Sequence, residues 1–600
     1  MEQGDIVLEV KDLSVSFDGR TVVDNVSYAL RRGRTLGIVG ESGSGKSVSS
    51  LAIMGLLPKN ATVSGKIELR TENGERKAEN GKRKAESGER KVESVDLLVL
   101  DEKQMQGVRG SRIAMIFQEP MTSLNPVQKC GAQVVEMLRL HEAVDYDEAR
   151  RRTIELFKEV LLPRPEKIFD SYPFEISGGQ KQRVMIAMAL ICKPDIIIAD
   201  EPTTALDVTV QKTILELLRD LQRSRNIAVI FITHDLGVIA QIADDIAVMY
   251  HGKIVEQGNA NGILHNPQHP YTQGLLACRP PMDSRPRHLP TVEEFMIAES
   301  GKRKAESGGR RAESGERKVE SGEVGAESGK RKTESGEPLL SVRNLDVTYT
   351  LEKNIFGKPL KQLKAVDGIS FDVYRGETLG LVGESGCGKT TLGRAIMRLV
   401  DSSSGSITFD GRRLDTLSQR EMRSLRPRIQ IIFQDPYSSL NPRMTVGQTI
   451  SEPLRVHRRN GRLSQSEIRS KVVDLMERVG LQPEWFDRYP HEFSGGQRQR
   501  ICIARALILN PDLVICDESV SALDVSVQAQ VLNLLNELKE QFGYTYIFIS
   551  HDLSVVHFIS DRIMVMQSGR MVELADADAL FSHPANAYTQ TLLDAIPRIE

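Results

Sequence analysis

The chain has 600 residues, of which 40% are hydrophobic and 27% are charged, and this composition predicts a soluble globular protein. Several domains are expected, because one core rarely exceeds about 250–300 residues. The formal net charge of -2 excludes a global basic field that would favour nucleic acid or anionic membranes. No apolar stretch approaches the roughly 20 residues that span a bilayer. The six scattered cysteines lack Cys-x-x-Cys spacing and favour a reducing cytosol over a disulfide framework.

A buried strand and a glycine-rich loop stand near the start of the chain. Alternating apolar residues predict strands at 8–10 and 13–17, and the apolar run 35–39 predicts a buried strand. The next eight residues fit G-x-x-x-x-G-K-[ST], a loop whose backbone N–H groups close around phosphate oxygens. They are Gly40, Glu41, Ser42, Gly43, Ser44, Gly45, Lys46 and Ser47. In this motif the lysine neutralises phosphate charge and the hydroxyl of Ser47 is suited to hold Mg²⁺.

Two adjacent carboxylates follow another buried strand. Four apolar residues at 196–199 lead into Asp200 and Glu201. Asp200 is placed to bind Mg²⁺, and Glu201 is suited to polarise an attacking water. An Asp-Glu pair alone is usually a solvated strand end, but its position after a phosphate loop favours the catalytic interpretation. A further strand at 228–232 leads to His234.

The second half of the chain repeats these features in the same order. Its phosphate loop follows the apolar run 378–382 and consists of Gly383, Glu384, Ser385, Gly386, Cys387, Gly388, Lys389 and Thr390. Asp517, Glu518 and His551 follow their counterparts by 317 residues. Strands are also predicted at 340–342, 345–349, 513–516 and 546–549, and helices at 129–140, 209–223 and 526–541. Two equivalent loops disfavour a bare glycine-rich turn, and they indicate two nucleotide sites.

Seven-residue repeats rich in Glu, Lys, Arg and Gly interrupt this pattern twice. The phosphate-loop lysines lie 343 residues apart, but later features lie 316 or 317 apart, so the first half carries an insertion, at 71–94. The same unit returns between the halves, from Glu299 to about Glu337. Its glycine and its lack of two apolar seam positions disfavour a coiled coil. We predict disorder; the alternative, a tether for nucleic acid or lipid, is disfavoured by the nearly balanced charge.

Two more motifs occur once in each half. Gln118 and Gln434 each follow Ile-Phe. A Ser-Gly-Gly-Gln sequence is formed by Ser177, Gly178, Gly179 and Gln180, and again by Ser494, Gly495, Gly496 and Gln497. The order of phosphate loop, Gln, Ser-Gly-Gly-Gln, Asp-Glu and His resembles the ABC ATPase family in both halves. By this resemblance, the two glutamines take part in catalysis and Mg²⁺ binding, and they link the nucleotide state to a membrane partner.

The resemblance implies further contacts with the nucleotide. His234 and His551 would touch the γ-phosphate, although a histidine at a strand end is otherwise most often structural. Phe17 and Tyr349 would stack on adenine rings, and the alternative is a core aromatic. The family's halves pair head to tail, so each Ser-Gly-Gly-Gln signature would complete the nucleotide site of the other half, with N–H donors aimed at the γ-phosphate. Asp207 and Asp524 match the loop that crosses between the sites.

Finer features resemble the ATPases of oligopeptide, dipeptide and glutathione importers. They are Glu-Pro-Met-Thr-Ser-Leu-Asn-Pro at 119–126, Asp-Pro-Tyr-Ser-Ser-Leu-Asn-Pro at 435–442, and related tails at 265–272 and 583–589. The resemblance implies a peripheral protein at the cytoplasmic face of the inner membrane that hydrolyses ATP with Mg²⁺. Its partners would be two integral membrane permease subunits and, indirectly, a periplasmic solute-binding protein, and no nucleic acid is expected.

Two other functions were weighed against import of peptides or related small solutes. A soluble twin-ABC ATPase acting on ribosomes or nucleic acid usually carries a long charged helix between its halves, whereas this linker is broken by glycine. A regulatory scaffold without hydrolysis conflicts with the presence of both Glu201 and Glu518. The expected fold is α/β, with two tandem ABC-type P-loop NTPase domains. Each has a mixed core sheet, an antiparallel β subdomain and a helical signature subdomain. We expect domains at 1–283 and 338–600, joined by a linker at 284–337.

Overall fold

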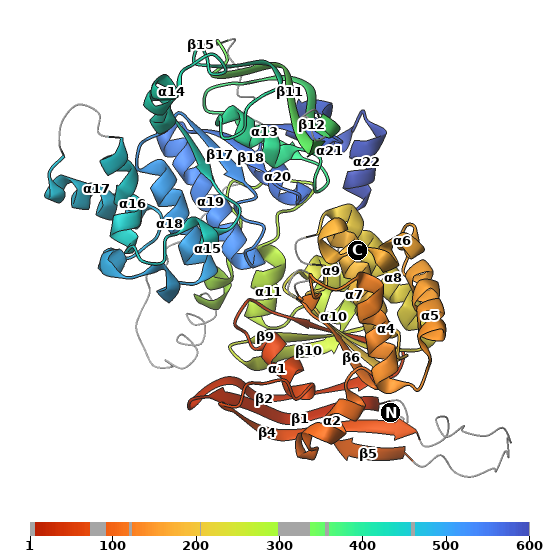
Figure 1. The fold of residues 1–600 in the computed structure, drawn as a ribbon. Helices are drawn as coiled ribbons and strands as arrows, with labels where there is room; N and C mark the ends of the chain where they lie inside the picture. The colour runs from red at the N-terminus through yellow and green to blue at the C-terminus, as the bar shows by residue number, and fades with distance from the viewer. Residues whose placement is uncertain are drawn as a thin grey trace, which may run out of the picture. The chain divides into compact units, whose positions relative to one another are not determined.

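The computed structural model describes residues 6–72, 92–118, 123–203, 206–297, 336–353, 359–457 and 463–598. Most of the predicted insertion at 71–94, and the predicted linker from 298 to 335, lie outside the described residues. The chain divides into two compact units, chiefly Met1–Arg279 for the first and Pro280–Leu523 with Val527–Leu593 for the second. Each unit is described by itself, and both repeat one architecture (Figure 1).

The first unit contains two sheets. The antiparallel sheet has the order β2 (Arg20–Arg31), β1 (Ile6–Phe17), β4 (Ala61–Glu72) and β5 (Val92–Asp96). The second sheet has the order β10 (Lys253–Asn259), β9 (Asp245–Tyr250), β3 (Thr35–Val39), β8 (Ala228–Thr233), β7 (Ile196–Asp200) and β6 (Ile113–Ile116). Only β10 pairs antiparallel in this second sheet. It is therefore the mixed core sheet expected for an α/β domain.

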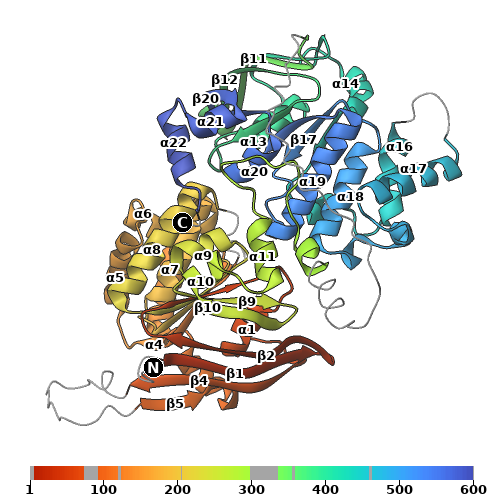
Figure 2. The same ribbon diagram turned by 180° about the vertical axis from the view of Figure 1, so that it is seen from behind.

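Helices surround the mixed sheet of the first unit. They are α1 (Lys46–Ile53), α2 (Glu102–Val108), α4 (Cys130–His141), α5 (Tyr146–Glu159), α6 (Pro165–Asp170), α7 (Gly178–Leu190), α8 (Val208–Arg225), α9 (Leu236–Ile242), α10 (Ala260–His265) and α11 (Pro270–Ala277). Short 3-10 turns occur at Leu97–Val99 and Pro173–Glu175. Helices α4, α5 and α7 contact one another and form the expected helical subdomain. Figures 1 and 2 show α5, α7 and α8 away from the layer of β1, β2 and β4.

One apolar core joins the two sheets of the first unit. It includes Leu8 and Ile67 from the antiparallel sheet and Ile198 and Ile230 from the mixed sheet, all fully or almost fully buried. Every residue of β3, β7 and β8 is buried, as expected for parallel strands covered on both faces. This core fixes the carboxyl ends of β3, β7 and β8 side by side, where the phosphate loop, the Asp-Glu pair and the histidine follow.

The second unit has the same two sheets. The antiparallel sheet has the order β12 (Pro359–Val373), β11 (Leu340–Lys353), β14 (Ser404–Phe409) and β15 (Arg412–Arg413). The mixed sheet has the order β16 (Ile429–Ile432), β17 (Leu513–Asp517), β18 (Thr545–Ile549), β13 (Thr378–Val382), β19 (Arg562–Gln567) and β20 (Arg570–Asp576). Again only the last strand, β20, pairs antiparallel.

Most helices of the second unit correspond to helices of the first. They are α13 (Lys389–Ile396), α14 (Gln419–Leu425), α15 (Pro436–Ser439), α16 (Val446–Val456), α17 (Gln465–Arg478), α18 (Gly495–Leu507), α19 (Val525–Phe542), α20 (Leu553–Ile559), α21 (Ala577–Ser582) and α22 (Ala587–Asp594). Short 3-10 turns lie at Arg426–Arg428, Pro483–Asp487 and Pro490–Glu492. Among the described residues, no helix has both the length and the apolar composition to cross a bilayer.

The predicted strands and helices are confirmed, with one difference at the start of each half. The paired strands predicted at 8–10 and 13–17 are one strand, β1, which is interrupted by a shift in register between Val10 and Leu13. Asp12 has a φ of 51° there, and its backbone N–H donates to the Ser27 hydroxyl at 2.8 Å. The matching irregularity in β11 is centred on Asn344, with a φ of 45°. A bulge in one continuous strand therefore interrupts the alternation.

Residues 284–297 differ from the predicted linker. They belong to the second compact unit, which begins at Pro280. Leu289 is fully buried. Its backbone N–H donates to the side-chain oxygen of Asn533 at 2.9 Å, and its carbonyl accepts from the Asn533 amide at 2.8 Å. Residues 284–297 therefore pack within the second unit and precede the repeats, which start at Glu299.

Candidate nucleotide-binding sites

The first phosphate loop connects the buried strand β3 to helix α1. Gly40 has a φ of 154°, and a Cβ there would lie 2.2 Å from the carbonyl oxygen of Met249, so only glycine fits. Lys46 is 5% exposed. Its Nζ donates to the carbonyl oxygens of Gly40 at 2.6 Å and Glu41 at 2.9 Å. The ammonium group of Lys46 is thus held by carbonyls of its own loop. The strand, loop and helix are those that the motif predicted.

The second phosphate loop repeats these contacts between β13 and α13. Gly383 has a φ of 146°, and a Cβ added there would lie 2.2 Å from the carbonyl oxygen of Met566. Lys389 Nζ donates to the carbonyls of Gly383 at 2.7 Å and Glu384 at 3.0 Å. Cys387 is buried like the other five cysteines, and burial raises the pKa of its thiol. It is therefore a neutral small residue of the loop.

A hydroxyl and a carboxylate meet beside each loop. Ser47 donates to Asp200 at 3.0 Å, and Thr390 donates to Asp517 at 2.9 Å. Hydroxyl and carboxylate oxygens are the hard ligands that Mg²⁺ prefers, so both pairs fit this ion. Burial raises the pKa of Asp200 to about 6 and raises that of Asp517 as well. At neutral pH the Asp200 carboxylate is still predominantly charged.

Glu201 stands at the end of β7 in a strained conformation. Its φ is 46°, and its backbone N–H donates to the Ile232 carbonyl at 2.9 Å. The Gln118 amide donates to Glu201 Oε2 at 3.1 Å, and His234 Nδ1 lies 3.3 Å from the same oxygen. Burial lowers the pKa of His234, but the hydrogen bond and charge of Glu201 outweigh it, so the net pKa is raised. Strain held in this way is typical of functional positions.

Glu518 repeats this arrangement in the second unit. Its φ is 48°, and its backbone N–H donates to the Ile549 carbonyl at 2.9 Å. The Gln434 amide donates to Glu518 Oε2 at 2.7 Å, and His551 Nδ1 lies 3.7 Å from it. Burial raises the pKa of Glu518, but the nearby His551, together with the charge of Lys389, lowers it overall. The carboxylate is thus ionised and can accept a proton.

Each signature sequence starts a helix and caps it. In the first unit, Ser177 Oγ accepts from the Gln180 N–H at 3.3 Å while the Gln180 side chain accepts from the Ser177 N–H at 3.0 Å. Ser494 and Gln497 form the same reciprocal pair at the start of α18. The remaining backbone N–H groups of the first turn point out of the helix end. The donation to a second nucleotide stays a prediction.

The structure gives the positions of the aromatic residues predicted to stack on adenine and of Asp207. Phe17, on β1, is half-buried and packs against the core of the first unit, whereas Tyr349, on β11, is 38% exposed. Stacking on adenine stays a prediction for both. Asp207 has a local role that the sequence analysis missed: it caps α8 by accepting from the Val210 N–H at 3.0 Å.

Comparison with known proteins decides the family. The family described as "ABC transporter" matches residues 23–204 and 366–521, which include both phosphate loops and both Asp-Glu pairs. This chain belongs to the ABC transporter family. It is an ATPase with two ATP-binding domains, each of the α/β class predicted. A second family, "Oligopeptide/dipeptide transporter, C-terminal region", matches 255–303 and 572–600.

Relatives of this ABC protein match it almost end to end. The "Glutathione import ATP-binding protein GsiA" of Salmonella typhimurium is 48% identical over 605 residues, covering 98% of this chain and 89% of that protein. The protein of the same name from Pectobacterium atrosepticum is 46% identical, with 98% and 89% covered. Among solved structures, cbiO1 of Clostridium perfringens is 30% identical, covering 41% of this chain and 92% of its own, with a TM-score of 0.36.

The C-terminal region of each half of this ABC protein reaches its phosphate loop. The hydroxyl of Tyr271, on α11, accepts from the Glu41 backbone N–H at 3.0 Å, and Tyr588, on α22, accepts from that of Glu384 at 3.2 Å. Both tails were predicted only as features shared with importer ATPases, without a role at the site. Their shared position in the two tails was the signal available.

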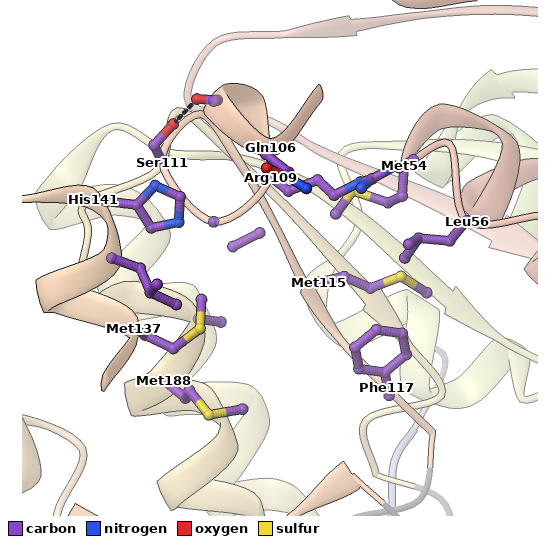
Figure 3. A pocket seen from close by; sticks show the side chains of 15 residues that line it. Met54, Leu56, Gln106, Arg109, Ser111, Met115, Phe117, Met137, His141 and Met188 are labelled. Atoms are coloured by element: carbon purple, nitrogen blue, oxygen red, sulfur yellow. Dashed lines mark hydrogen bonds between the residues drawn. The ribbon is translucent and has the colours of Figure 1, made fainter. Parts of the chain in front are cut away.

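A cavity of about 950 Å³ lies in the first ABC domain, and Phe117, the residue before Gln118, is part of its lining (Figure 3). Its lining is rich in thioethers and includes Met54, Met115, Met137, Met188 and Phe117. The equivalent cavity of the second domain, about 680 Å³, borders Gln434 and is lined by charged groups, among them Arg394, Arg505 and Glu452. The two halves therefore offer chemically different surfaces next to their glutamines.

Proposed function

We propose that this chain is the subunit that energises a bacterial importer of peptides or related small solutes by hydrolysing ATP. One observation supports the proposal: both halves hold matching contacts of a lysine, a hydroxyl, an aspartate, a glutamate, a glutamine and a histidine. Neither half has lost the glutamate that a hydrolytic site requires. Both nucleotide sites are therefore expected to turn over ATP.

The residues of each site have distinct tasks in this proposal. Lys46 and Lys389 leave their loop carbonyls for the β- and γ-phosphates, since a phosphate is the stronger acceptor. Ser47 with Asp200, and Thr390 with Asp517, would hold Mg²⁺, which neutralises the charge of the transferred group when bound. Glu201 and Glu518 accept a proton from the attacking water.

Gln118 and Gln434 belong to the same carboxylate networks. Each donates to the catalytic glutamate through its amide, at 3.1 Å and 2.7 Å. A γ-phosphate that draws Glu201 or Glu518 toward its attacking water would change that hydrogen bond. His234 and His551, beside the same carboxylates, are proposed to contact the γ-phosphate. A change of nucleotide would thus alter the contacts of the glutamine, which lines the cavity of the second domain and directly follows Phe117 of the cavity in the first.

The head-to-tail pairing of the two domains is part of the proposal. The signature helices α7 and α18 present unpaired N–H groups at their starts, and such helix ends bind phosphate. Each signature would then complete the site of the other half. Closure would occur with two ATP molecules bound, and hydrolysis would release it.

The cavities beside the glutamines are the proposed docking places for two integral membrane permease subunits. Methionines adapt to irregular apolar partners, so the first cavity suits an apolar segment. The second cavity, lined by arginines and a glutamate, suits a polar one. The protein would then lie peripherally at the cytoplasmic face of the inner membrane, in one fixed orientation on two different permease subunits.

The cargo is proposed from the relatives. Two relatives named for glutathione import match nearly the whole chain, and the tails match a region named for oligopeptide and dipeptide transporters. Import of glutathione or short peptides, handed over by a periplasmic solute-binding protein, is therefore the function proposed.

Affinity capture from native membranes tests this proposal. We expect two integral membrane proteins to co-purify with the tagged chain, and Met188→Arg to weaken their recovery because it replaces a thioether of the methionine cluster by a charged group. Met188→Leu is the matched control and should retain them. Recovery of ribosomal proteins in their place would assign the chain to the soluble twin-ABC class.

A further inference from the structure

We propose that Tyr271 and Tyr588 are positioning residues that hold the two phosphate loops ready for nucleotide. This role goes beyond the proposed transport function, because it concerns the ATPase sites alone. It gives the C-terminal region of each half a task in nucleotide binding.

In the first unit, one peptide group of the loop is held from both sides. The peptide that joins Gly40 to Glu41 gives its carbonyl oxygen to Lys46 Nζ at 2.6 Å and its N–H to Tyr271 Oη at 3.0 Å. The strained φ of Gly40 precedes this peptide directly. The orientation of the peptide plane therefore depends on a lysine that leaves for phosphate and on a tyrosine that stays.

The second unit shows the same arrangement. The Gly383 carbonyl accepts from Lys389 Nζ at 2.7 Å, and the Glu384 N–H donates to Tyr588 Oη at 3.2 Å. The surrounding sequence differs, since Tyr271 packs on Tyr250, with ring centroids 4.2 Å apart, where the second half has a glutamine at 567. The contact thus recurs in two different environments, which indicates that the hydroxyl itself is the common requirement.

A carboxylate anchors each tyrosine-bearing helix. Glu256, on β10, accepts from the backbone N–H groups of Gln268 at 2.7 Å and His269 at 3.2 Å, directly before α11. In the second unit, Glu573 on β20 accepts from Ala585 at 2.8 Å and Asn586 at 3.2 Å, before α22. Each tail is therefore hydrogen-bonded to the edge strand of the mixed sheet, directly before the helix that contacts the phosphate loop.

Burial keeps the tyrosine hydroxyl in its neutral, protonated form. Tyr271 is fully buried, and burial raises the pKa of its hydroxyl well above the ordinary value. The neutral hydroxyl accepts from the loop without adding negative charge next to a phosphate site. Tyr588 is only partly buried. We therefore expect the larger effect of substitution in the first half.

Removal of the hydroxyl leaves the Glu41 or Glu384 N–H without its acceptor. The peptide can then rotate when the lysine moves to phosphate, so nucleotide must order the loop as it binds. One hydrogen bond of ordinary net strength corresponds to about fivefold in binding. Since ATP and ADP need the same loop shape, both should bind more weakly. The chemical step should change little, because the interaction is uniform for substrate and transition state.

The test compares Tyr271→Phe and Tyr588→Phe with a matched control, Tyr546→Phe, in the full chain. Tyr546 is fully buried, and its hydroxyl has no hydrogen-bond partner among the described residues. We expect Tyr271→Phe to raise KM for ATP and the dissociation constant for ADP about fivefold, and Tyr588→Phe to raise both by less, with kcat within about twofold in each variant. The control should match the wild type. Unchanged KM in both loop variants would overturn the proposal.

A second variant separates positioning from folding. Glu256→Gln should raise KM in the same direction, and adding it to Tyr271→Phe should give less than the product of the two effects, because both act through one contact. A fall in melting temperature with unchanged KM would mean a structural role only. Loss of one of the two nucleotide sites in Lys46→Ala checks the site independently, so failure of the tyrosine role and failure of the site can be told apart.

Discussion

At the residue scale, a buried lysine determines how each phosphate loop behaves. Lys46 and Lys389 are 5% and 4% exposed, and each bonds to two carbonyls of its own loop. Burial lowers the pKa of Lys46, and the nearby carboxylates of Glu201 and Asp200 raise it again in part. A cation held this way is already partly desolvated, so a phosphate gains a strong contact at little further cost.

We predict that Lys46→Ala and Lys389→Ala each reduce steady-state ATPase activity strongly, by about 10²-fold at the altered site. The reason is that no other described side chain occupies the place of the lysine on the Gly40 or Gly383 carbonyl. Lys253→Ala, on an exposed side chain of the same first unit, is the control and should leave the rate unchanged. Wild-type turnover in either loop variant would refute the paired-site interpretation.

At the element scale, the signature helices begin with two glycines that have different reasons to be there. A Cβ on Gly496 would lie 2.2 Å from Val527 Cγ1 on α19, whereas a Cβ on Gly495 would meet nothing closer than 4.0 Å. The first unit repeats the contrast, with 2.6 Å at Gly179 and 3.9 Å at Gly178. The second glycine of each signature is therefore required by helix packing, whatever the first one does for nucleotide.

Gly496→Ala should therefore lower the melting temperature while Gly495→Ala should not. Overpacking of a fixed contact costs about 1–3 kcal/mol, and about 1 kcal/mol shifts the midpoint of a domain of this size by roughly 2–4 °C. Val527 is β-branched and cannot turn away freely in a helix. The added substitution Val527→Ala should restore part of the loss, measured by thermal unfolding. Equal midpoints for the two glycine variants would contradict this account.

Sequence patterns were sufficient for most elements, but not for contacts across the chain. Buried strands such as β7 and β18 were predicted from short runs of apolar residues, because parallel strands carry that signal locally. The bulge at Asp12 divided one strand into two predicted ones, since the irregular residues are polar. The Tyr271 contact joins a helix near the end of the domain to a loop near its start, and no spacing rule encodes that. Likewise, no local pattern around Leu289 predicts that its backbone bonds to the Asn533 side chain.

At the scale of the whole molecule, the insertion sits at a position that tolerates length. The chain leaves β4 at Glu72 and returns at Val92, and these two residues are directly paired across the strands. The ends of the inserted segment are therefore held together by the sheet itself. Loop entropy changes slowly with length, by about 0.6 kcal/mol for each doubling.

Replacement of residues 73–91 by Asn-Gly should leave ATPase activity and the melting temperature near their wild-type values. Asn-Gly closes a two-residue hairpin, so the β4–β5 pairing should persist. ATPase rate and thermal unfolding of the full chain are the measurements. A same-length Gly-Ser replacement serves as the control for composition. Loss of folding in the shortened chain, but not in the control, would show that the length of the segment is needed.

The burial of all six cysteines has a practical consequence at this scale. Thiol reagents would find no native sulfur at the surface of the folded chain. Two cysteines introduced at exposed positions, such as Val99 in the first unit and Val456 in the second, could carry a donor and an acceptor dye. Because no native thiol would be labelled, energy transfer between the two dyes would report the distance between the halves. It could be followed with and without ATP while each molecule turns over.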